Sequence, residues 1–145
     1  MERHWMRNMV LLIDVNVLLD FLMRREPNYL YAKKIVDFCY DEKADGYMAF
    51  HSISIIWYTL RKKRVENLRH TLWDLCKVIK VSGAENEDVL DALLNENFPD
   101  FEDCLQEKCA ENVGVDYIVT ENIKDFKTSS IPAVTSAEMV GMLTK

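Results

Sequence analysis

The chain has 145 residues, of which 49% are hydrophobic and 29% charged, and it carries a net charge of −6. Such a chain can form one domain with a sizeable core, and its acidity argues against nucleic-acid binding driven by charge over the whole surface. No apolar run approaches the roughly 18 residues of a membrane span, so we expect a cytoplasmic protein with no membrane partner. The four cysteines form no C-x-x-C pair and the three histidines are scattered, which predicts reduced thiols and argues against a zinc site.

Residues 1–8 are polar and lack the apolar stretch of a signal peptide, so we expect a short extension before a single domain over residues 9–145. Residues 10–13 form an apolar run without alternation, which is typical of a strand buried on both faces of a parallel sheet. Apolar residues at helical spacing then predict helices over 17–22 and 29–40, with Pro27 between them. A polar turn over 41–46 and a second strand over 47–50 follow.

The rest of the chain continues to alternate between predicted helices and strands. Residues 52–64 are rich in β-branched and aromatic side chains, but their length and basic end favour a helix. A helix over 66–76 and a strand over 78–81 precede Ser82 and Glu85, which we interpret as a capping box that opens a helix to about residue 95. Asp100 is the expected N-cap of a helix to about residue 113. Strands over 116–120 and 131–134, and a last helix opened by a capping box at Thr135, complete the prediction.

This alternation predicts an α/β fold, with three layers (α/β/α) around a central parallel sheet of four to five strands. Ligands of such sheets bind outside the carboxyl ends of the strands. Acidic and amide residues from three segments are expected at this edge: Asp14 and Asn16; Asp100, Glu102 and Asp103; and Asn122 and Asp125. Two carboxylates about 4 Å apart repel by roughly 4 kcal/mol at an effective dielectric of 20. A hard cation relieves that repulsion, so the segments predict a site for Mg²⁺ or Mn²⁺.

Three stretches carry a resemblance to a known family. LLIDVNVLL (residues 11–19), DFEDCLQ (100–106) and DYIVTENIKDF (116–126) resemble the three signature segments of PIN domains. The likeness runs from about residue 9 to the C-terminus and implies a PIN-like α/β fold with a Mg²⁺- or Mn²⁺-dependent endoribonuclease site. Many bacterial members of this family are toxins of toxin–antitoxin pairs and act as dimers. The resemblance therefore implies an RNA substrate, an antitoxin partner and a homodimer.

The resemblance also implies roles for single residues. Asp14 matches the first metal-binding aspartate of PIN domains, with Asn16 as the residue that orders it. Asp103 matches the acidic residue of the later helix, so Asp14 and Asp103 are the expected catalytic residues. The residues after the last conserved strand complete the expected site: Asn122 and Asp125 as metal ligands, and Thr120 in support. Each also has an ordinary structural interpretation, since Asp and Asn cap helices and form turns.

One position departs from the family pattern. PIN nucleases commonly carry another acidic residue in the helix after the second strand, but residues 52–61 contain no carboxylate, and Ile55 stands at the matching place. Loss of one ligand charge should weaken metal binding. The alternative function is therefore a catalytically weakened or inactive PIN-like module that binds RNA or a protein.

Two other chemistries also place an aspartate after a first strand. A phosphatase of the haloacid-dehalogenase kind needs a second aspartate two residues on as its general acid, and Asn16 cannot donate that proton. A receiver domain needs its acceptor aspartate after a later strand, and no aspartate directly follows residues 47–50 or 78–81. Both interpretations are weaker than a PIN-like nuclease.

The remaining polar and aromatic candidates have structural and functional interpretations. The basic residues Arg61, Lys62 and Arg64 form either a solvated helix end or a contact for RNA phosphates. Glu102 points roughly 100° away from Asp103 around the helix and is expected on the surface, as is Asp20 on its own helix. The aromatic residues of residues 52–76 are expected in the core or a subunit interface rather than as base-stacking platforms: Trp57, Tyr58 and Trp73.

Overall fold

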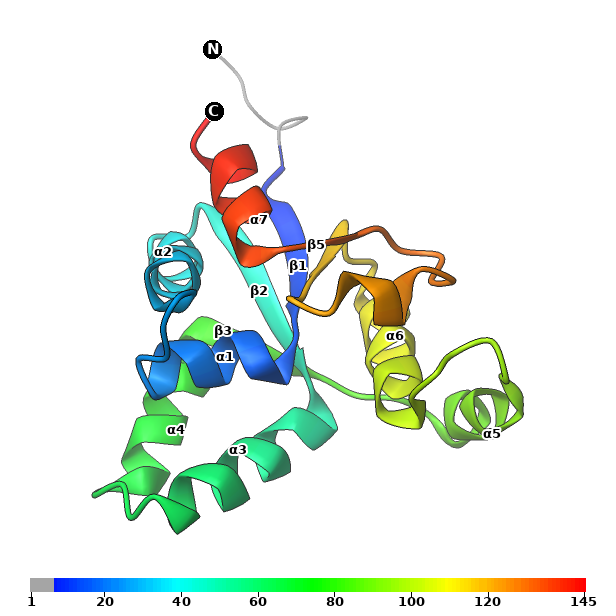
Figure 1. The fold of residues 1–145 in the computed structure, drawn as a ribbon, viewed down its shortest axis with the longest axis horizontal. Coiled ribbons are helices and arrows are strands. Elements are labelled where there is room, and N and C mark those ends of the chain that lie inside the picture. The colour runs from blue at the N-terminus through cyan, green and yellow to red at the C-terminus, as the bar shows by residue number, and fades with distance from the viewer. Residues whose placement is uncertain (1–6) are drawn as a thin grey trace.

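Five parallel strands form the central sheet of the computed structural model, which describes residues 7–145 (Figure 1). Their order across the sheet is β3-β2-β1-β4-β5, so β1 is central and pairs with β2 and β4. The strands are β1 (Met9–Ile13), β2 (Ala44–Ala49), β3 (Ile79–Ser82), β4 (Tyr117–Val119) and β5 (Ala133–Val134). The predicted parallel sheet of four to five strands is confirmed.

Helices cover both faces of this sheet (Figure 1). They are α1 (Val15–Leu22), α2 (Tyr29–Tyr40), α3 (Phe50–Lys62), α4 (Leu68–Val78), α5 (Asn86–Leu94), α6 (Phe101–Val113) and α7 (Ser136–Leu143), with a 3-10 helix η1 (Ile123–Phe126). The segment whose β-branched content favoured a strand is therefore the helix α3, as its length and basic end predicted. None of the helices within residues 7–145 is long and apolar enough to reach across a bilayer.

The apolar run of β1 separates two cores. Leu11 and Ile13 are fully buried among residues of α1, α2, α3, α4 and α7, whereas Leu12 is fully buried on the other face with residues of α5 and α6. Successive side chains of a strand point to opposite faces, so three consecutive buried apolar residues require a layer on each side. This arrangement confirms the three-layer prediction and places the end of β1 between the layers.

Strand β2 begins three residues before its predicted start. The predicted polar turn extends only to Lys43, because Asp45 pairs with Val10 and Gly46 with Leu11 of β1. A Cβ atom at Gly46 would lie 2.8 Å from Cys39 Sγ, so the close approach of α2 to the sheet requires glycine here.

The predicted capping box at Ser82 is wrong. Ser82 ends β3, is buried, and donates its hydroxyl to the carbonyl oxygen of Cys109 at 2.8 Å. The capping box of α5 lies three residues later, where Glu85 N–H donates to Asp88 Oδ2 at 2.8 Å. A buried hydroxyl needs a hydrogen-bond partner, and the carbonyl of α6 supplies it, so Ser82 is not free to cap a helix.

The surface position predicted for Asp20 is also wrong. Its side chain is buried, and it accepts a hydrogen bond from Arg25 Nε at 2.8 Å, within an ion pair. The core interpretation fails for Tyr58 and Trp73, which are 60% and 57% exposed, whereas Trp57 packs against the core.

The predicted N-terminal extension is described only in part, since residues 1–6 lie outside the described residues. Arg7 donates to both carboxylate oxygens of Asp116 at 2.6 and 2.9 Å, and Asn8 Nδ2 donates to the carbonyl oxygen of Glu42 at 2.7 Å. These two residues therefore contact the domain that follows them.

Candidate active site

Asp14 lies directly after β1, at the carboxyl edge of the sheet, and only 2% of it is exposed. Its Oδ2 accepts a hydrogen bond from Thr120 Oγ1 at 2.8 Å, and its Oδ1 accepts one from Gln106 Nε2 at 3.0 Å. Thr120 follows β4, the neighbour of β1, and Gln106 belongs to α6. The adjacent strand and the covering helix therefore fix the orientation of the Asp14 carboxylate.

The environment of Asp14 disfavours its negative charge. Burial raises the pKa of Asp14, the hydrogen bonds from Gln106 and Thr120 lower it, and the charge of Glu102 raises it again, so that the pKa lies above its usual range. A positive charge next to Asp14 would reverse this effect.

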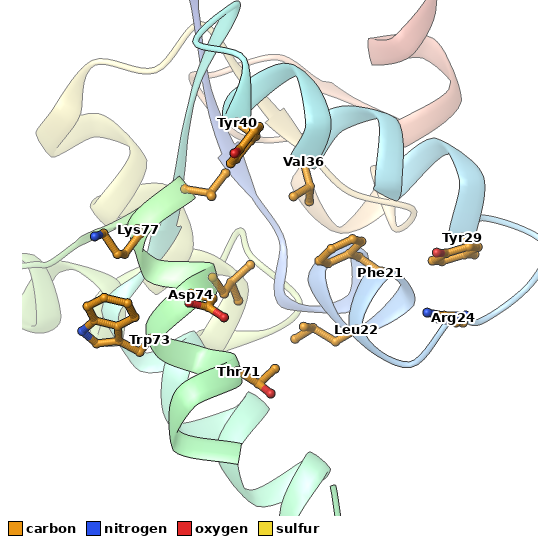
Figure 2. Close-up of a pocket in the computed structure, with 12 residues that line it drawn as sticks. Phe21, Leu22, Arg24, Tyr29, Val36, Tyr40, Thr71, Trp73, Asp74 and Lys77 are labelled. Atoms are coloured by element: carbon orange, nitrogen blue, oxygen red, sulfur yellow. The ribbon is translucent and has the colours of Figure 1, made fainter. Parts of the chain in front are cut away.

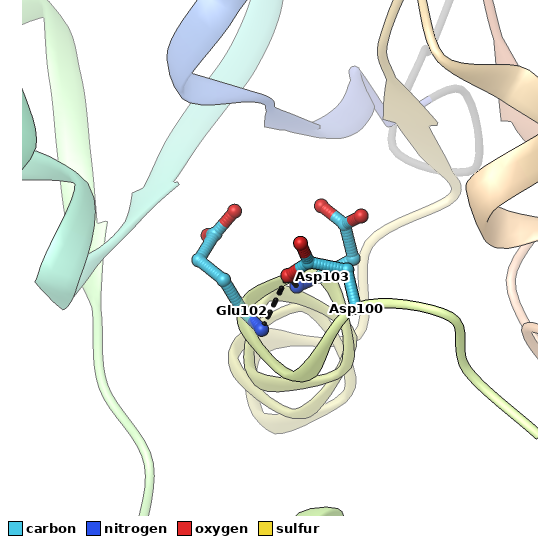
Figure 3. A group of neighbouring side chains, drawn as sticks. All are labelled: Asp100, Glu102 and Asp103. Carbon is cyan, nitrogen blue, oxygen red and sulfur yellow. Dashed lines mark hydrogen bonds between the residues drawn. The ribbon is translucent and has the colours of Figure 1, made fainter. Parts of the chain in front are cut away.

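The first turn of α6 brings three more carboxylates to the same edge. Asp100 caps the helix, accepting hydrogen bonds from the backbone N–H groups of Glu102 at 2.7 Å and Asp103 at 3.3 Å. Figure 3 shows the side chains of Asp100, Glu102 and Asp103 projecting from this end of α6, and each offers a carboxylate oxygen within 4.8 Å of the others. The three residues therefore form one acidic group at the edge where Asp14 lies.

The neighbouring carboxylates change the pKa of Asp103. Burial and the negative charges of Glu102, Asp14, Asp100 and Asp125 raise the pKa of Asp103 to about 7. The two predicted catalytic residues, Asp14 and Asp103, thus lie close enough to repel each other. Asp125, in η1, also belongs to this electrostatic group.

The surface position predicted for Glu102 is wrong. Its Oε2 lies 2.5 Å from Nε2 of His51, and its Oε1 accepts a hydrogen bond from Gln106 Nε2 at 3.3 Å. The sequence prediction included neither His51 nor Gln106. The i, i+4 spacing of Glu102 and Gln106 is the signal that could have paired them on one helical face, whereas nothing local in the sequence places His51 beside α6.

His51 brings the opposite charge to the site. Burial lowers the pKa of His51, but contacts with Cys109 and Glu102 outweigh this effect and raise the pKa to about 9. The imidazole is therefore a cation at neutral pH, and its Nε2 donates to the Glu102 carboxylate.

Two other predicted site residues, Asn16 and Asn122, are exposed to solvent. Asn16 is exposed in the first turn of α1, and its carbonyl oxygen accepts from Arg25. Asn122 is also exposed, while its backbone N–H donates to Thr120 Oγ1 at 3.0 Å and its carbonyl accepts from the backbone N–H of Asp125. The structure thus places Asn122 and Asp125 in the turn that follows Thr120.

The basic residues of α3 lie away from the acidic group. Arg61, Lys62 and Arg64 are exposed at the C-terminal end of α3, whereas His51 is in its first turn. Ten residues of α-helix separate Arg61 from His51, which is about 15 Å along the axis. The predicted contact with RNA phosphates therefore requires a strand that extends along α3.

The donor set of this site fits Mg²⁺ or Mn²⁺. Asp14, Asp103 and Asp125 offer carboxylate oxygens, and the buried Oε1 of Gln106 has no hydrogen-bond partner within the described residues. Oxygen ligands select hard divalent cations over zinc or copper. These residues would hold the cation, which would offset the repulsion that raises the pKa of Asp103.

A separate groove with a volume of about 660 Å³ lies between α1, α2 and α4 (Figure 2). Phe21 and Leu22 of α1, Val36 of α2 and Trp73 of α4 line it. This groove shares no residue with the acidic group, so it is a second surface feature rather than part of the candidate active site.

Comparisons with known proteins agree with this fold. A family model described as PIN domain matches residues 10–124, whereas no curated protein sequence matches the chain. Three solved structures are similar. A toxin–antitoxin complex from Klebsiella pneumoniae is 19% identical with a TM-score of 0.64, over 86% of this chain and 96% of that one. VapBC2 from Rickettsia felis bound to a DNA fragment from their promoter is 12% identical with a TM-score of 0.61, over 88% and 98%. VapBC-1 from nontypeable Haemophilus influenzae is 15% identical with a TM-score of 0.59, over 89% and 99%.

At these identities the solved structures show a shared fold alone. The family model spans most of the chain and includes two of the acidic segments in full, those around Asp14 and Asp103. The chain therefore belongs to the PIN domain family.

Proposed function

We propose that this protein is a metal-dependent endoribonuclease that hydrolyses RNA phosphodiester bonds, and that it is the toxin of a toxin–antitoxin pair. The observation that carries the proposal is the convergence of Asp14, Asp103 and Asp125 at the carboxyl edge of a PIN domain sheet. The similar structures from Klebsiella pneumoniae, Rickettsia felis and Haemophilus influenzae support the toxin role, since the first is described as a toxin–antitoxin complex. Such a toxin acts on RNA in the cytoplasm.

The residues of the site have distinct roles in this reaction. Mg²⁺ or Mn²⁺, when bound, supplies Lewis-acid stabilisation and a more acidic water molecule. Asp14 and Asp103 are the principal ligands, and Thr120 and Gln106 hold the Asp14 carboxylate in one orientation. Asp125 and the exposed Asn122 are further ligands from the turn after Thr120, while Asn16 stands at the start of α1 beside Asp14.

RNA cleavage with and without metal tests this function. The purified protein is expected to cut a mixed-sequence RNA in about 1 mM MnCl₂, a concentration chosen to saturate the metal site. It is expected to lose this activity when EDTA is added. A metal-independent activity would contradict the mechanism. Binding of RNA without cleavage at any metal concentration would instead favour the alternative, a PIN-like binding module, for which the aliphatic Ile55 of α3 is the supporting observation.

The groove between α1, α2 and α4 is the surface that we propose for the antitoxin (Figure 2). It is lined mainly by apolar side chains, and its charged residues are Arg24, Lys77 and Asp74, which suits an apolar helix that carries acidic residues opposite the two cations. The exposed α3 residues Phe50 and Tyr58 are a candidate surface for the proposed homodimer.

Trp73→Ala is expected to weaken binding of the proposed antitoxin at least about tenfold, because tryptophans that become buried in an interface are frequent hot spots. Leu94→Ala is the matched control, since Leu94 of α5 is also an exposed apolar residue, at 81%, but does not line the groove. Titration calorimetry with the purified partner measures both variants. Equal affinities for both would exclude the groove as the antitoxin site.

A further inference from the structure

The first turns of α3 present a histidine, not a carboxylate, to the acidic group. His51 lies on the same helix face as Ile55, one turn before it, and Ile55 is the position where the PIN nuclease pattern places an acid. The His51 Nε2 is 2.5 Å from Glu102 Oε2, so α3 and α6 meet here through a charged hydrogen bond. A carboxylate has no proton to give, so Nε2 is the donor of this bond.

Glu102 lies close to the other acidic residues. Its Oε1 and the Oδ1 of Asp14 both accept hydrogen bonds from the same atom, Gln106 Nε2, at 3.3 and 3.0 Å. A carboxylate oxygen of Glu102 also lies within 4.8 Å of the nearest ones of Asp100 and Asp103. One side chain therefore adjoins both predicted principal ligands, Asp14 and Asp103, although it comes from α6 rather than from α3.

Gln106 supplies an independent sign that a ligand belongs here. Its side chain is fully buried, its amide lies between the carboxylates of Asp14 and Glu102, and its Oε1 has no partner within the described residues. A buried carbonyl oxygen without a hydrogen-bond partner destabilises the folded state. A hydrated cation among these carboxylates would bring hydrogen-bond donors to this oxygen.

We propose that Glu102 supplies the metal-binding carboxylate that α3 lacks, and that His51 positions it. The proposal rests on the metal-dependent function proposed above. The bond from His51 holds Oε2, and the long bond from Gln106, at 3.3 Å, leaves Oε1 available to a cation. His51 thus acts on Glu102 as outer residues of metal sites act on ligands, by fixing the side chain before the ion binds.

Titration calorimetry with Mn²⁺ as the probe tests the role of Glu102. Glu102→Gln keeps the size of the side chain and removes its charge, so Mn²⁺ is expected to bind at least about tenfold more weakly. Glu102→Asp keeps the charge but shortens the reach, and it is expected to weaken binding as well. Glu87→Gln is the matched control, because Glu87 is exposed on the neighbouring helix α5 and its loss changes the net charge equally.

Asp14→Asn in the same series separates this proposal from the proposed function. If Asp14→Asn abolishes binding while both Glu102 variants match the wild type, the role of Glu102 is overturned and the metal site stands. If the wild type binds no Mn²⁺ at millimolar concentration, both are overturned. Melting curves without metal show that each variant is folded.

His51 is tested by a pair of substitutions. His51→Ala removes the donor to Glu102 and is expected to weaken Mn²⁺ binding about tenfold, whereas His51→Gln, which retains an N–H donor, is expected to preserve most of the affinity. A merely structural role would lower the melting temperature of His51→Ala and leave its Mn²⁺ affinity unchanged. That result would overturn the positioning role.

Discussion

Asp14→Asn is expected to abolish Mn²⁺ binding and to reduce RNA cleavage at least about 1,000-fold. Lewis-acid stabilisation by a bound cation is worth several kcal/mol, and each 1.4 kcal/mol is a factor of ten in rate. Asp14 is 2% exposed, lies where β1 ends and is held by hydrogen bonds from Thr120 and Gln106. The oxygen of an asparagine can still accept from Gln106 Nε2, and its amide nitrogen can donate to Thr120 Oγ1, so the fold is expected to persist. Calorimetry with Mn²⁺ and single-turnover cleavage measure the two effects.

Asp20→Asn is the control for this variant. Asp20 is also buried and also belongs to the β1–α1 region, but it pairs with Arg25 and takes no part in the acidic group. Its substitution is expected to lower the melting temperature, because it weakens the ion pair with Arg25, and to leave Mn²⁺ affinity unchanged. Retained cleavage by Asp14→Asn would mean that the reaction does not depend on this carboxylate.

Much of the fold follows from local pattern. Three consecutive apolar residues, Leu11 to Ile13, predict a strand covered on both faces, and the acid that follows such a strand must lie at the carboxyl edge of the sheet. Asp14 was predictable for this reason. The failure at Ser82 shows the limit of local pattern. Its spacing to Glu85 satisfies a capping box, but a hydrogen bond to Cys109, 27 residues away, takes the hydroxyl.

Glu102 shows why the candidate site was only partly predictable. The expectation that Glu102 faces solvent considered only the angle around the axis of α6, where consecutive residues are separated by 100°. The site instead lies off the N-terminal end of α6, and helical side chains lean toward the N-terminus. Both Glu102 and Asp103 can therefore reach it (Figure 3). The contact with His51 joins residues 51 positions apart, so only the assembled fold reveals it.

Asp103→Asn is expected to stabilise the metal-free protein, although it removes a proposed catalytic residue. Burial and the charges of Glu102, Asp14, Asp100 and Asp125 raise the pKa of Asp103 from 3.8 to about 7. Between these two pH values the folded protein holds a proton that the unfolded chain does not. The free energy of unfolding therefore falls as the pH rises through this window and levels off above it.

The wild type without metal is accordingly expected to melt at a lower temperature at pH 8 than at pH 5, and Asp103→Asn is expected to show a smaller difference. At pH 8 the variant should be more stable by about 1 kcal/mol, a value that allows for solvent screening at this half-buried site, or roughly 3 °C in melting temperature. His51, whose pKa is about 9, loses its stabilising contribution as the pH rises through 9. It is present in both proteins, so their difference isolates Asp103.

Metal should reverse the order of the two proteins. A cation present at 100 times its dissociation constant stabilises the folded state by about 2.7 kcal/mol, and only the wild type has the full set of ligands to bind it. With saturating Mn²⁺ at pH 8 the wild type is therefore expected to melt above Asp103→Asn, whereas without metal it melts below. Thermal melting in MnCl₂ and in EDTA measures both orders. If Asp103→Asn melts below the wild type in EDTA, then Asp103 stabilises the fold by its charge, and the carboxylates at the sheet edge do not repel one another as proposed.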